Sequence, residues 1–122
     1  IDKRRASYLG KFTSRVCDLH EDYMRPQENG SHTDCDYLIL KGTDLTFATA
    51  GEKTFSFNAS PYTQEELTTK KHSYELQPCG STVLCLDYAQ NGIGSNSCGP
   101  ELSEQYRLDA EEFDFEIKMM IK

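Results

Sequence analysis

The stretch Phe113-Asp-Phe-Glu-Ile-Lys-Met-Met-Ile-Lys122 has the clearest repeating pattern in this sequence. Apolar side chains stand at every second position from Phe113 to Ile121, and charged side chains fill all but one of the positions between them. Strict alternation is typical of a β-strand that turns one face to a core and the other to solvent. The segment 113–122 therefore predicts a half-buried strand and a fold built on sheets.

The same kind of pattern recurs, in shorter form, through much of the chain. Turn-forming residues separate the strand-like segments, among them Gly42-Thr43-Asp44 and Gly51-Glu52-Lys53. The further expected strands are 35–41, 45–50, 55–58, 74–76 and 82–88, with a strand or lead-in at 106–108. Six or seven short strands with turns between them favour an antiparallel all-β sandwich. Strands do not alternate with long helical patterns, which argues against a catalytic barrel or a nucleotide-binding fold.

One short helix is expected at residues 62–71. Thr63 can cap its first turn, Glu66 follows three residues later as in a capping box, and Leu67 supplies an apolar contact. The expected fold class is thus all-β, an antiparallel β-sandwich with one short helix.

Length and composition limit the classes of function. A chain of 122 residues is one domain or less, and because it opens on Ile1 we expect it to be a fragment of a larger protein. A net charge of -7 disfavours a nucleic-acid partner, since phosphate binding needs clustered Lys and Arg. No apolar run approaches the ~20 residues that span a bilayer, so no membrane partner is expected. Five cysteines without a framework spacing suit free thiols, and we expect a soluble, cytoplasmic protein.

Two cysteines and two histidines form the most metal-like pattern, Cys17-x-x-His20 followed by His32-x-x-Cys35. These residue types can bind zinc. The second pair enters an expected strand, however, where side chains three positions apart point to opposite faces. We therefore favour the interpretation that they bind no metal.

Neighbouring carboxylates occur at 21–22, 65–66 and 111–112. Adjacent side chains diverge on a strand or a helix, so none of these pairs can bracket one glycosidic bond by itself. The three histidines all lie outside the segment that contains Cys98, which leaves that thiol without a neighbouring base. No catalytic residue is expected in this chain.

Residues 90–100 (QNGIGSNSCGP) follow the expected strand at 82–88 and carry three of the eight glycines. Glycine permits unusual backbone angles and lets another molecule approach the chain closely. The segment lacks the third glycine and the following helix of a dinucleotide-binding loop. It is either a plain connection or a shaped loop at a binding site.

Three segments together are similar to one known family. Residues 23–34 (YMRPQENGSHTD), 55–62 (FSFNASPY) and 92–100 (GIGSNSCGP) resemble the C-terminal end of the large, multidomain β-galactosidases of glycoside hydrolase family 2. Their order and spacing agree along nearly the whole chain, so residues 1–122 look like the C-terminal part of the terminal β-sandwich domain.

The resemblance implies a galactose mutarotase-like supersandwich, and an enzyme that hydrolyses terminal β-galactosides such as lactose with retention. It places the catalytic glutamates on a separate barrel domain upstream, so the catalytic domain is absent from this chain. It implies no cofactor in this part, with Mg and Na ions bound mostly by other domains. The implied partners are the galactoside substrate and the upstream catalytic domain of the same chain.

The family resemblance also gives residues 90–100 a role at the substrate site. Relatives carry a tryptophan that stacks on the sugar where this sequence has Cys98, and the chain contains no tryptophan. The expected substrate-binding residues are Asn96, Ser97 and Cys98, with hydrogen bonds from the first two in place of stacking.

Two other functions remain open from the sequence, namely a free-standing carbohydrate-binding β-sandwich module and an independent mutarotase-type enzyme. Because a truncated sandwich leaves strand edges and an apolar face uncovered, we also expect the fragment to self-associate.

Overall fold

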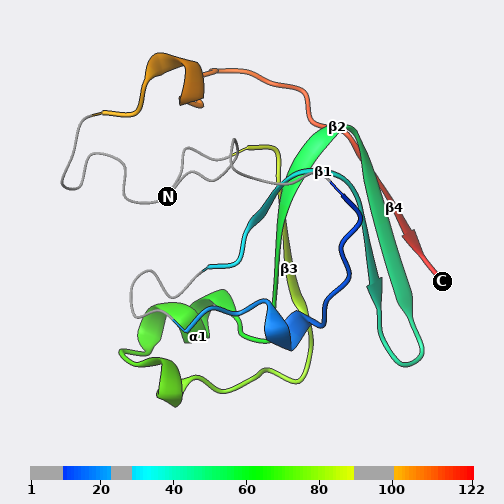
Figure 1. Ribbon diagram of the computed structural model, residues 1–122, viewed down its shortest axis with the longest axis vertical. Helices are drawn as coiled ribbons and strands as arrows, with labels where there is room; N and C mark the ends of the chain where they lie inside the picture. Colours follow the sequence, from blue (N-terminus) through cyan, green and yellow to red (C-terminus); the bar gives the residue numbers. More distant parts are fainter. Residues whose placement is uncertain (1–9, 23–28, 90–100) are drawn as a thin grey trace. The chain divides into compact units, whose positions relative to one another are not determined.

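The computed structural model describes residues 10–22, 29–89 and 101–122. Strands dominate this part of the chain (Figure 1), with one short helix and three isolated 3₁₀ turns. In chain order the elements are a 3₁₀ turn at Val16–Asp18, β1 (His32–Lys41), β2 (Thr46–Ser60), α1 (Gln64–Thr69), a 3₁₀ turn at Ser73–Glu75, β3 (Val83–Asp87), a 3₁₀ turn at Glu104–Tyr106 and β4 (Ile117–Ile121).

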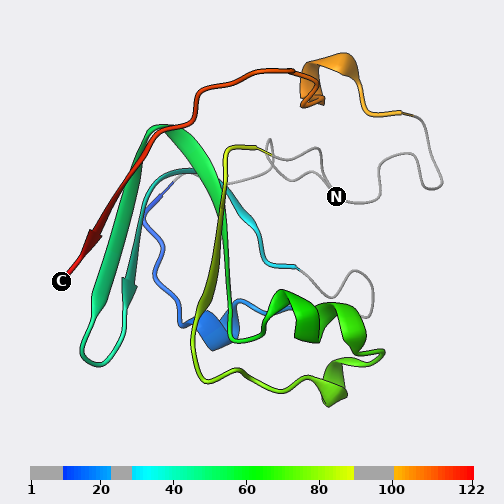
Figure 2. The same cartoon turned by 180° about the vertical axis from the view of Figure 1, so that it is seen from behind.

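The long strand β2 organises the sheet, because each of the other described strands pairs with it. β1 and β3 lie on either side of β2. β4 pairs antiparallel with the first part of β2, with Thr49 opposite Met119 and Gly51 opposite Ile117. Figures 1 and 2 both show β4 running beside this part of β2.

The chain divides into two compact units, and β2 contributes to both. Unit 1 contains the described residues 33–56, 87–89 and 101–122, whereas unit 2 contains 10–22, 29–32 and 57–86. The large apolar side chains buried in unit 1 are Leu38 and Phe55, and those buried in unit 2 are Leu67 and Leu76. Each unit therefore has only a small core among the described residues.

The predicted turn at residues 51–53 is wrong, because β2 runs without a break from Thr46 to Ser60. Gly51 pairs with Ile117 inside the ladder. A Cβ atom at Gly51 would lie 2.2 Å from the carbonyl oxygen of Lys53, so the backbone approaches itself closely here. Glycine lets β2 bend at this point while it keeps its pairing, and the same glycine imitates a turn in the sequence.

The predicted helix is confirmed in a shorter form. α1 begins after Thr63, whose hydroxyl oxygen accepts a hydrogen bond of 3.1 Å from the backbone N–H of Glu66. Leu67 is buried, as expected for the apolar side of the helix. The Glu66 carboxylate does not complete the capping box; it accepts a hydrogen bond from the backbone N–H of Gln77 at 2.8 Å.

Three expected strand segments differ from the structure. Residues 74–76 overlap the 3₁₀ turn Ser73–Glu75, and residues 106–108 begin on the last residue of the turn Glu104–Tyr106. In the C-terminal segment only Ile117–Ile121 forms a strand, because the ladder with β2 begins at Gly51 and Ile117. The alternation from Phe113 to Glu116 predicts more pairing than the structure has.

The predicted fold class is confirmed. The structure is mostly antiparallel sheet with one short helix, consistent with an all-β sandwich. The expected strands at 35–41 and 82–88 correspond to β1 and β3. Within the described ranges, no helix has the length and apolar character needed to cross a membrane.

Candidate functional site

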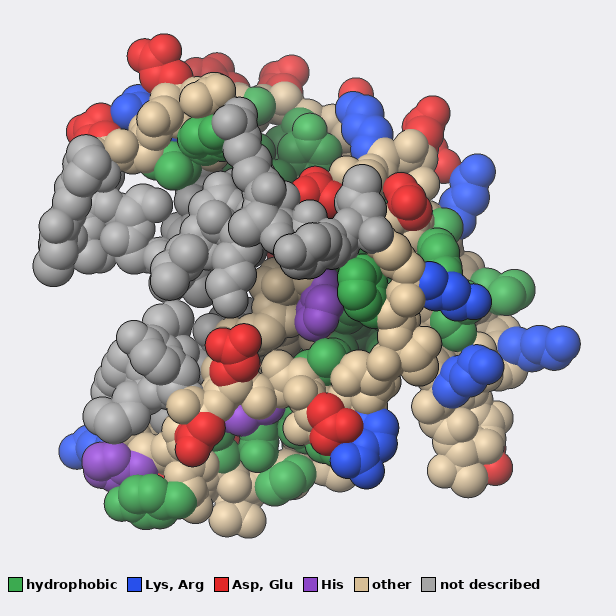
Figure 3. Space-filling view, viewed as in Figure 1, with side chains coloured by type: hydrophobic (Ala, Val, Ile, Leu, Met, Phe, Trp, Pro, Cys, Tyr) green, Lys and Arg blue, Asp and Glu red, His purple; other side chains and the backbone are tan. Residues whose placement is uncertain are grey.

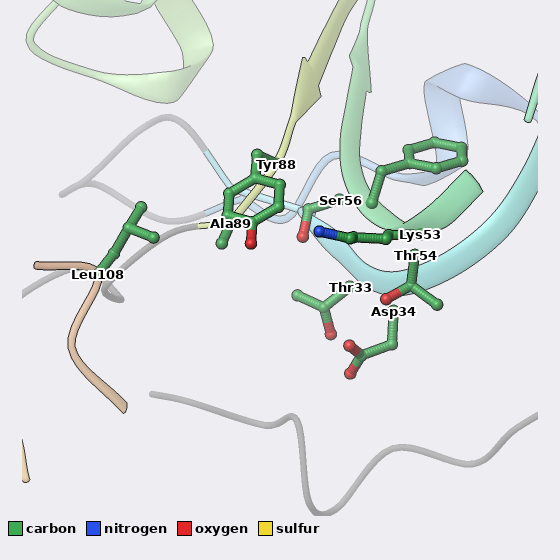
Figure 4. Close-up of a pocket in the computed structure, with 9 residues that line it drawn as sticks. Thr33, Asp34, Lys53, Thr54, Ser56, Tyr88, Ala89 and Leu108 are labelled. Atoms are coloured by element: carbon green, nitrogen blue, oxygen red, sulfur yellow. The ribbon is translucent and has the colours of Figure 1, made fainter. Parts of the chain in front are cut away.

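A pocket of about 290 Å³ lies in unit 1, where β1, β2 and the residues directly after β3 contribute side chains. Its apolar lining is formed by Phe55, Ala89 and Leu108. Its polar lining is larger, and consists of Thr33, Asp34, Lys53, Thr54, Ser56 and Tyr88. Figure 4 shows the Lys53 side chain extending toward Ser56 and Tyr88, with its amine foremost.

Asp34 enters the pocket from an unusual backbone conformation. It is the non-glycine residue with a positive φ, 55°, among those described. Aspartate tolerates this left-handed region better than most residues, at a cost on the order of 1 kcal/mol. Residues held in sparsely populated backbone regions concentrate at functional sites. The conformation of Asp34 thus marks this end of β1 as a candidate binding position.

Strand β2 positions the opposite part of the lining. Phe55 is 1% exposed and fixes the strand by its burial, while the neighbouring Ser56 is 5% exposed and lines the pocket. Lys53 and Thr54 are exposed and stand near the bend at Gly51. The strand that Phe55 anchors therefore places the Ser56 hydroxyl and the Lys53 ammonium group at the same cavity.

Tyr88 is oriented by two aromatic rings of the C-terminal segment. Its ring stacks on Phe113 with a centroid separation of 4.7 Å, and it meets Phe115 edge-on at 5.6 Å. Such pairs stabilise by about 0.5–1.5 kcal/mol beyond the burial of area. The stack fixes the chain directly after β3, where residues 90–100 begin.

The pocket carries one group of each charge. Within the described ranges, neither Asp34 nor Lys53 forms an ion pair or a side-chain hydrogen bond.

Burial raises the pKa of the neighbouring Cys35 thiol, and the carboxylates of Asp34 and Asp36 raise it further. Cys35 is therefore a protonated thiol at neutral pH and a poor nucleophile.

The expected substrate-binding residues Asn96, Ser97 and Cys98 lie outside the described residues. The chain that follows them is held by Arg107, which donates to the Leu102 carbonyl oxygen at 2.7 Å and to the Glu101 carboxylate at 2.9 Å. Tyr88 and Arg107 thus have defined partners on either side of residues 90–100 in the sequence.

Two of the three segments that carry the family resemblance meet in unit 2. The Asn29 side chain accepts from the Glu21 backbone N–H at 2.9 Å and donates to the Glu21 carbonyl oxygen. The buried Asn58 amide donates in turn to the Asn29 carbonyl oxygen. Gly30 has a φ of 74°, and a Cβ there would lie 2.6 Å from the Leu19 carbonyl oxygen. These hydrogen bonds join residues 21, 29 and 58 and have a structural role.

The four residues of the zinc-like pattern have other surroundings. His20 packs edge-on against Tyr62, and His32 stacks on Phe57 at a centroid distance of 4.7 Å. Cys17 and Cys35 are free thiols, as are Cys79 and Cys85. No group of three or more His, Cys, Asp and Glu side chains in the described part of the chain could hold a metal ion.

Sequence reasoning missed Asp34 and Lys53 as pocket residues. Lys53 stood in a predicted turn, and Asp34 ends the family-like segment 23–34, to which the sequence assigned no binding role. The signal that identifies Asp34, its positive φ, exists only in the folded chain.

By its fold and its pocket, the chain is part of an all-β domain with a mostly polar pocket at its sheet. The family model described as "Beta galactosidase small chain" matches residues 1–119, so the chain belongs to that family. The resemblance predicted from the sequence is confirmed.

Individual relatives agree with the family match. The chain is 55% identical over 113 residues to a beta-galactosidase of Actinobacillus pleuropneumoniae, covering 93% of this chain and 11% of that protein. It is 43% identical over 121 residues to a beta-galactosidase of Staphylococcus xylosus, covering 98% and 12%. A beta-galactosidase of Kluyveromyces lactis is 37% identical over 122 residues, covering 97% and 11%. The chain therefore spans about a tenth of the length of these relatives.

Proposed function

We propose that this chain is a non-catalytic part of a retaining β-galactosidase that hydrolyses terminal β-galactosides such as lactose. The observation that carries this function is the match of residues 1–119 to the beta-galactosidase small chain family. In the proposed parent, residues 90–100 help to shape the substrate site, and Asn96 and Ser97 bond to the sugar. Mg and Na ions, where the parent uses them, bind mostly to other domains.

The chemistry of the reaction supports a non-catalytic role. A retaining glycosidase needs two carboxyl groups about 5–5.5 Å apart, one as acid/base and the other as nucleophile. The described lining of the unit 1 pocket contains a single carboxylate, Asp34. The catalytic pair then belongs to a domain upstream in the parent, which is the main partner of this chain.

The aromatic anchor at Tyr88 supports a shaping role for residues 90–100. Tyr88, two residues before this segment, stacks on Phe113, and Arg107 donates to the carbonyl oxygen of Leu102, two residues after it. Fixed residues on both flanks favour a role in shaping the site, because preorganised surroundings reduce the ordering entropy lost on binding.

The first experiment compares residues 1–122 alone with the intact parent on a chromogenic β-galactoside. The parent is expected to turn over and the chain alone to show no hydrolysis above background. Sustained hydrolysis by the purified chain would overturn the non-catalytic role. Micromolar binding of galactose by the inactive chain would favour a free-standing carbohydrate-binding module instead.

The second experiment tests residues 90–100 in the intact parent. Asn96→Ala and Ser97→Ala each remove a hydrogen bond of about 0.5–1.5 kcal/mol, so kcat/KM is expected to fall about twofold to tenfold. Ser103→Ala is the matched control, because the Ser103 side chain makes no capping hydrogen bond and is exposed. Unchanged kcat/KM in both loop variants would contradict a substrate-site role.

A further inference from the structure

We propose that the pocket of unit 1 is a binding site for an uncharged, polyhydroxylated ligand of about monosaccharide size. The groups that would recognise this ligand are Asp34, Lys53, Ser56 and Tyr88. All four belong to the described residues, and this site is proposed in addition to the substrate-binding residues Asn96, Ser97 and Cys98.

Charge selects the class of ligand. Asp34 and Lys53 contribute opposite formal charges, and the other lining residues are uncharged, so the lining has no net charge. A phosphate or carboxylate ligand would meet the Asp34 carboxylate, and an ammonium ligand would meet Lys53. A neutral ligand can use both groups, because a hydroxyl donates to a carboxylate and accepts from an ammonium.

Unused hydrogen-bonding capacity is the second argument. In the described part of the chain, the Asp34 carboxylate and the Lys53 ammonium have no side-chain or backbone partner. The Ser56 hydroxyl lines the cavity although the residue is 5% exposed. Figure 4 shows that the Lys53 amine is directed toward Ser56 and Tyr88, so several polar groups converge. Hydroxyl-rich ligands match such alternating donors and acceptors.

Size and shape are the third argument. A volume of about 290 Å³ lies near the lower end of the roughly 300–1,000 Å³ typical of ligand sites, which suits one sugar ring. Phe55, Ala89 and Leu108 add apolar surface that can contact the C–H groups of such a ring. The polar majority of the lining disfavours an aliphatic or aromatic hydrocarbon.

The experiment titrates the intact parent with myo-inositol, which is not a galactoside, and detects binding by saturation-transfer difference NMR. We expect saturable binding with a dissociation constant on the order of 1–10 mM, because a small open pocket offers few contacts. Inorganic phosphate is the charged comparison probe and is expected to bind more weakly than myo-inositol.

Three conservative variants test the assignment of residues. Asp34→Asn, Lys53→Met and Tyr88→Phe keep shape and remove one polar function each, so each is expected to raise the dissociation constant of myo-inositol about threefold to tenfold. Lys118→Ala, an exposed lysine of β4 outside the pocket, is the matched control and should leave it unchanged. Thermal unfolding of each variant verifies that it is folded.

The outcomes separate this site from the proposed substrate site. Asn96→Ala is expected to bind myo-inositol as the native protein does, whatever its kcat/KM for a galactoside. Absence of saturable binding up to about 100 mM, equal binding by native protein and all three pocket variants, or tighter binding of phosphate would each overturn the assignment.

Discussion

Gly51 shows how a single residue can decide the course of a strand. The carbonyl oxygen of Lys53 occupies the space that a side chain would need, 2.2 Å from an ideal Cβ position. The residue nevertheless pairs with Ile117 in the ladder of β2 and β4. The pocket residues Lys53 and Ser56 come two and five positions after Gly51 on the same strand, so the bend at Gly51 also affects where their side chains lie.

At the residue scale, Gly51→Ala is expected to destabilise the protein by about 1–3 kcal/mol, because either the methyl group or the Lys53 carbonyl must move. Gly80→Ala is the matched control, since Gly80 has a φ of 77° but no atom within 4 Å of an ideal Cβ position. Gly80→Ala should cost about 1–2 kcal/mol from backbone strain alone. Urea unfolding measures both, and a smaller loss for Gly51→Ala than for Gly80→Ala would contradict the steric explanation.

At the scale of elements, hydrogen bonds from carboxylates organise the chain after α1. Glu66 accepts from the Gln77 backbone at 2.8 Å. Glu75 accepts from the backbone N–H groups of Lys71 and His72 at 3.0 and 3.1 Å. These bonds support the 3₁₀ turn Ser73–Glu75, where alternation alone predicts a strand at 74–76. Local polar groups thus override the apolar pattern of Tyr74 and Leu76.

The Glu75 carboxyl gives this element a defined pH dependence. Backbone hydrogen bonds from Lys71 and His72 lower the pKa of Glu75 below its usual 4.5. Since the folded pKa lies below the unfolded one, the stabilisation is fully present above about pH 5.5 and is lost as pH falls through the folded pKa. The difference in Tm between native protein and Glu75→Gln should therefore shrink from pH 7 to pH 3. A difference that stays constant over this range would refute the linkage.

At the scale of the whole molecule, exposed apolar side chains concentrate in unit 1. On β1, Tyr37 and Ile39 are each half exposed, and on β4 Met119 and Ile121 are 63% and 66% exposed. The alternation at 113–121 predicts that Met119 and Ile121 face a core, but none of the described residues covers them. Acidic side chains are spread along residues 101–116, which Figure 3 shows as a red series over the C-terminal segment.

This uncovered surface predicts self-association of residues 1–122 in isolation. Burial of apolar area favours association by about 25 cal/mol per Å², so the weight-average mass should rise with concentration in sedimentation equilibrium. Met119→Lys/Ile121→Lys should reduce this rise, whereas Tyr74→Lys, at an exposed position in unit 2, should not. A monomeric mass at millimolar concentration would disprove the prediction.

Patterns in the amino-acid sequence were sufficient to predict the all-β class, the helix cap at Thr63 and the family. Alternation, a capping residue and three spaced segments are local properties, so they can be recognised without knowledge of the folded chain. The folded chain was needed to show that β2 continues through Gly51, that residues 74–76 overlap a 3₁₀ turn, and that Asp34 and Lys53 meet in one pocket. The pairing of Gly51 with Ile117 and the meeting of Asp34 and Lys53 depend on contacts between residues far apart in the chain, which leave no periodic trace in a sequence. The turn at Ser73–Glu75 depends on local hydrogen bonds to the Glu75 carboxylate, which the alternation of apolar residues does not record.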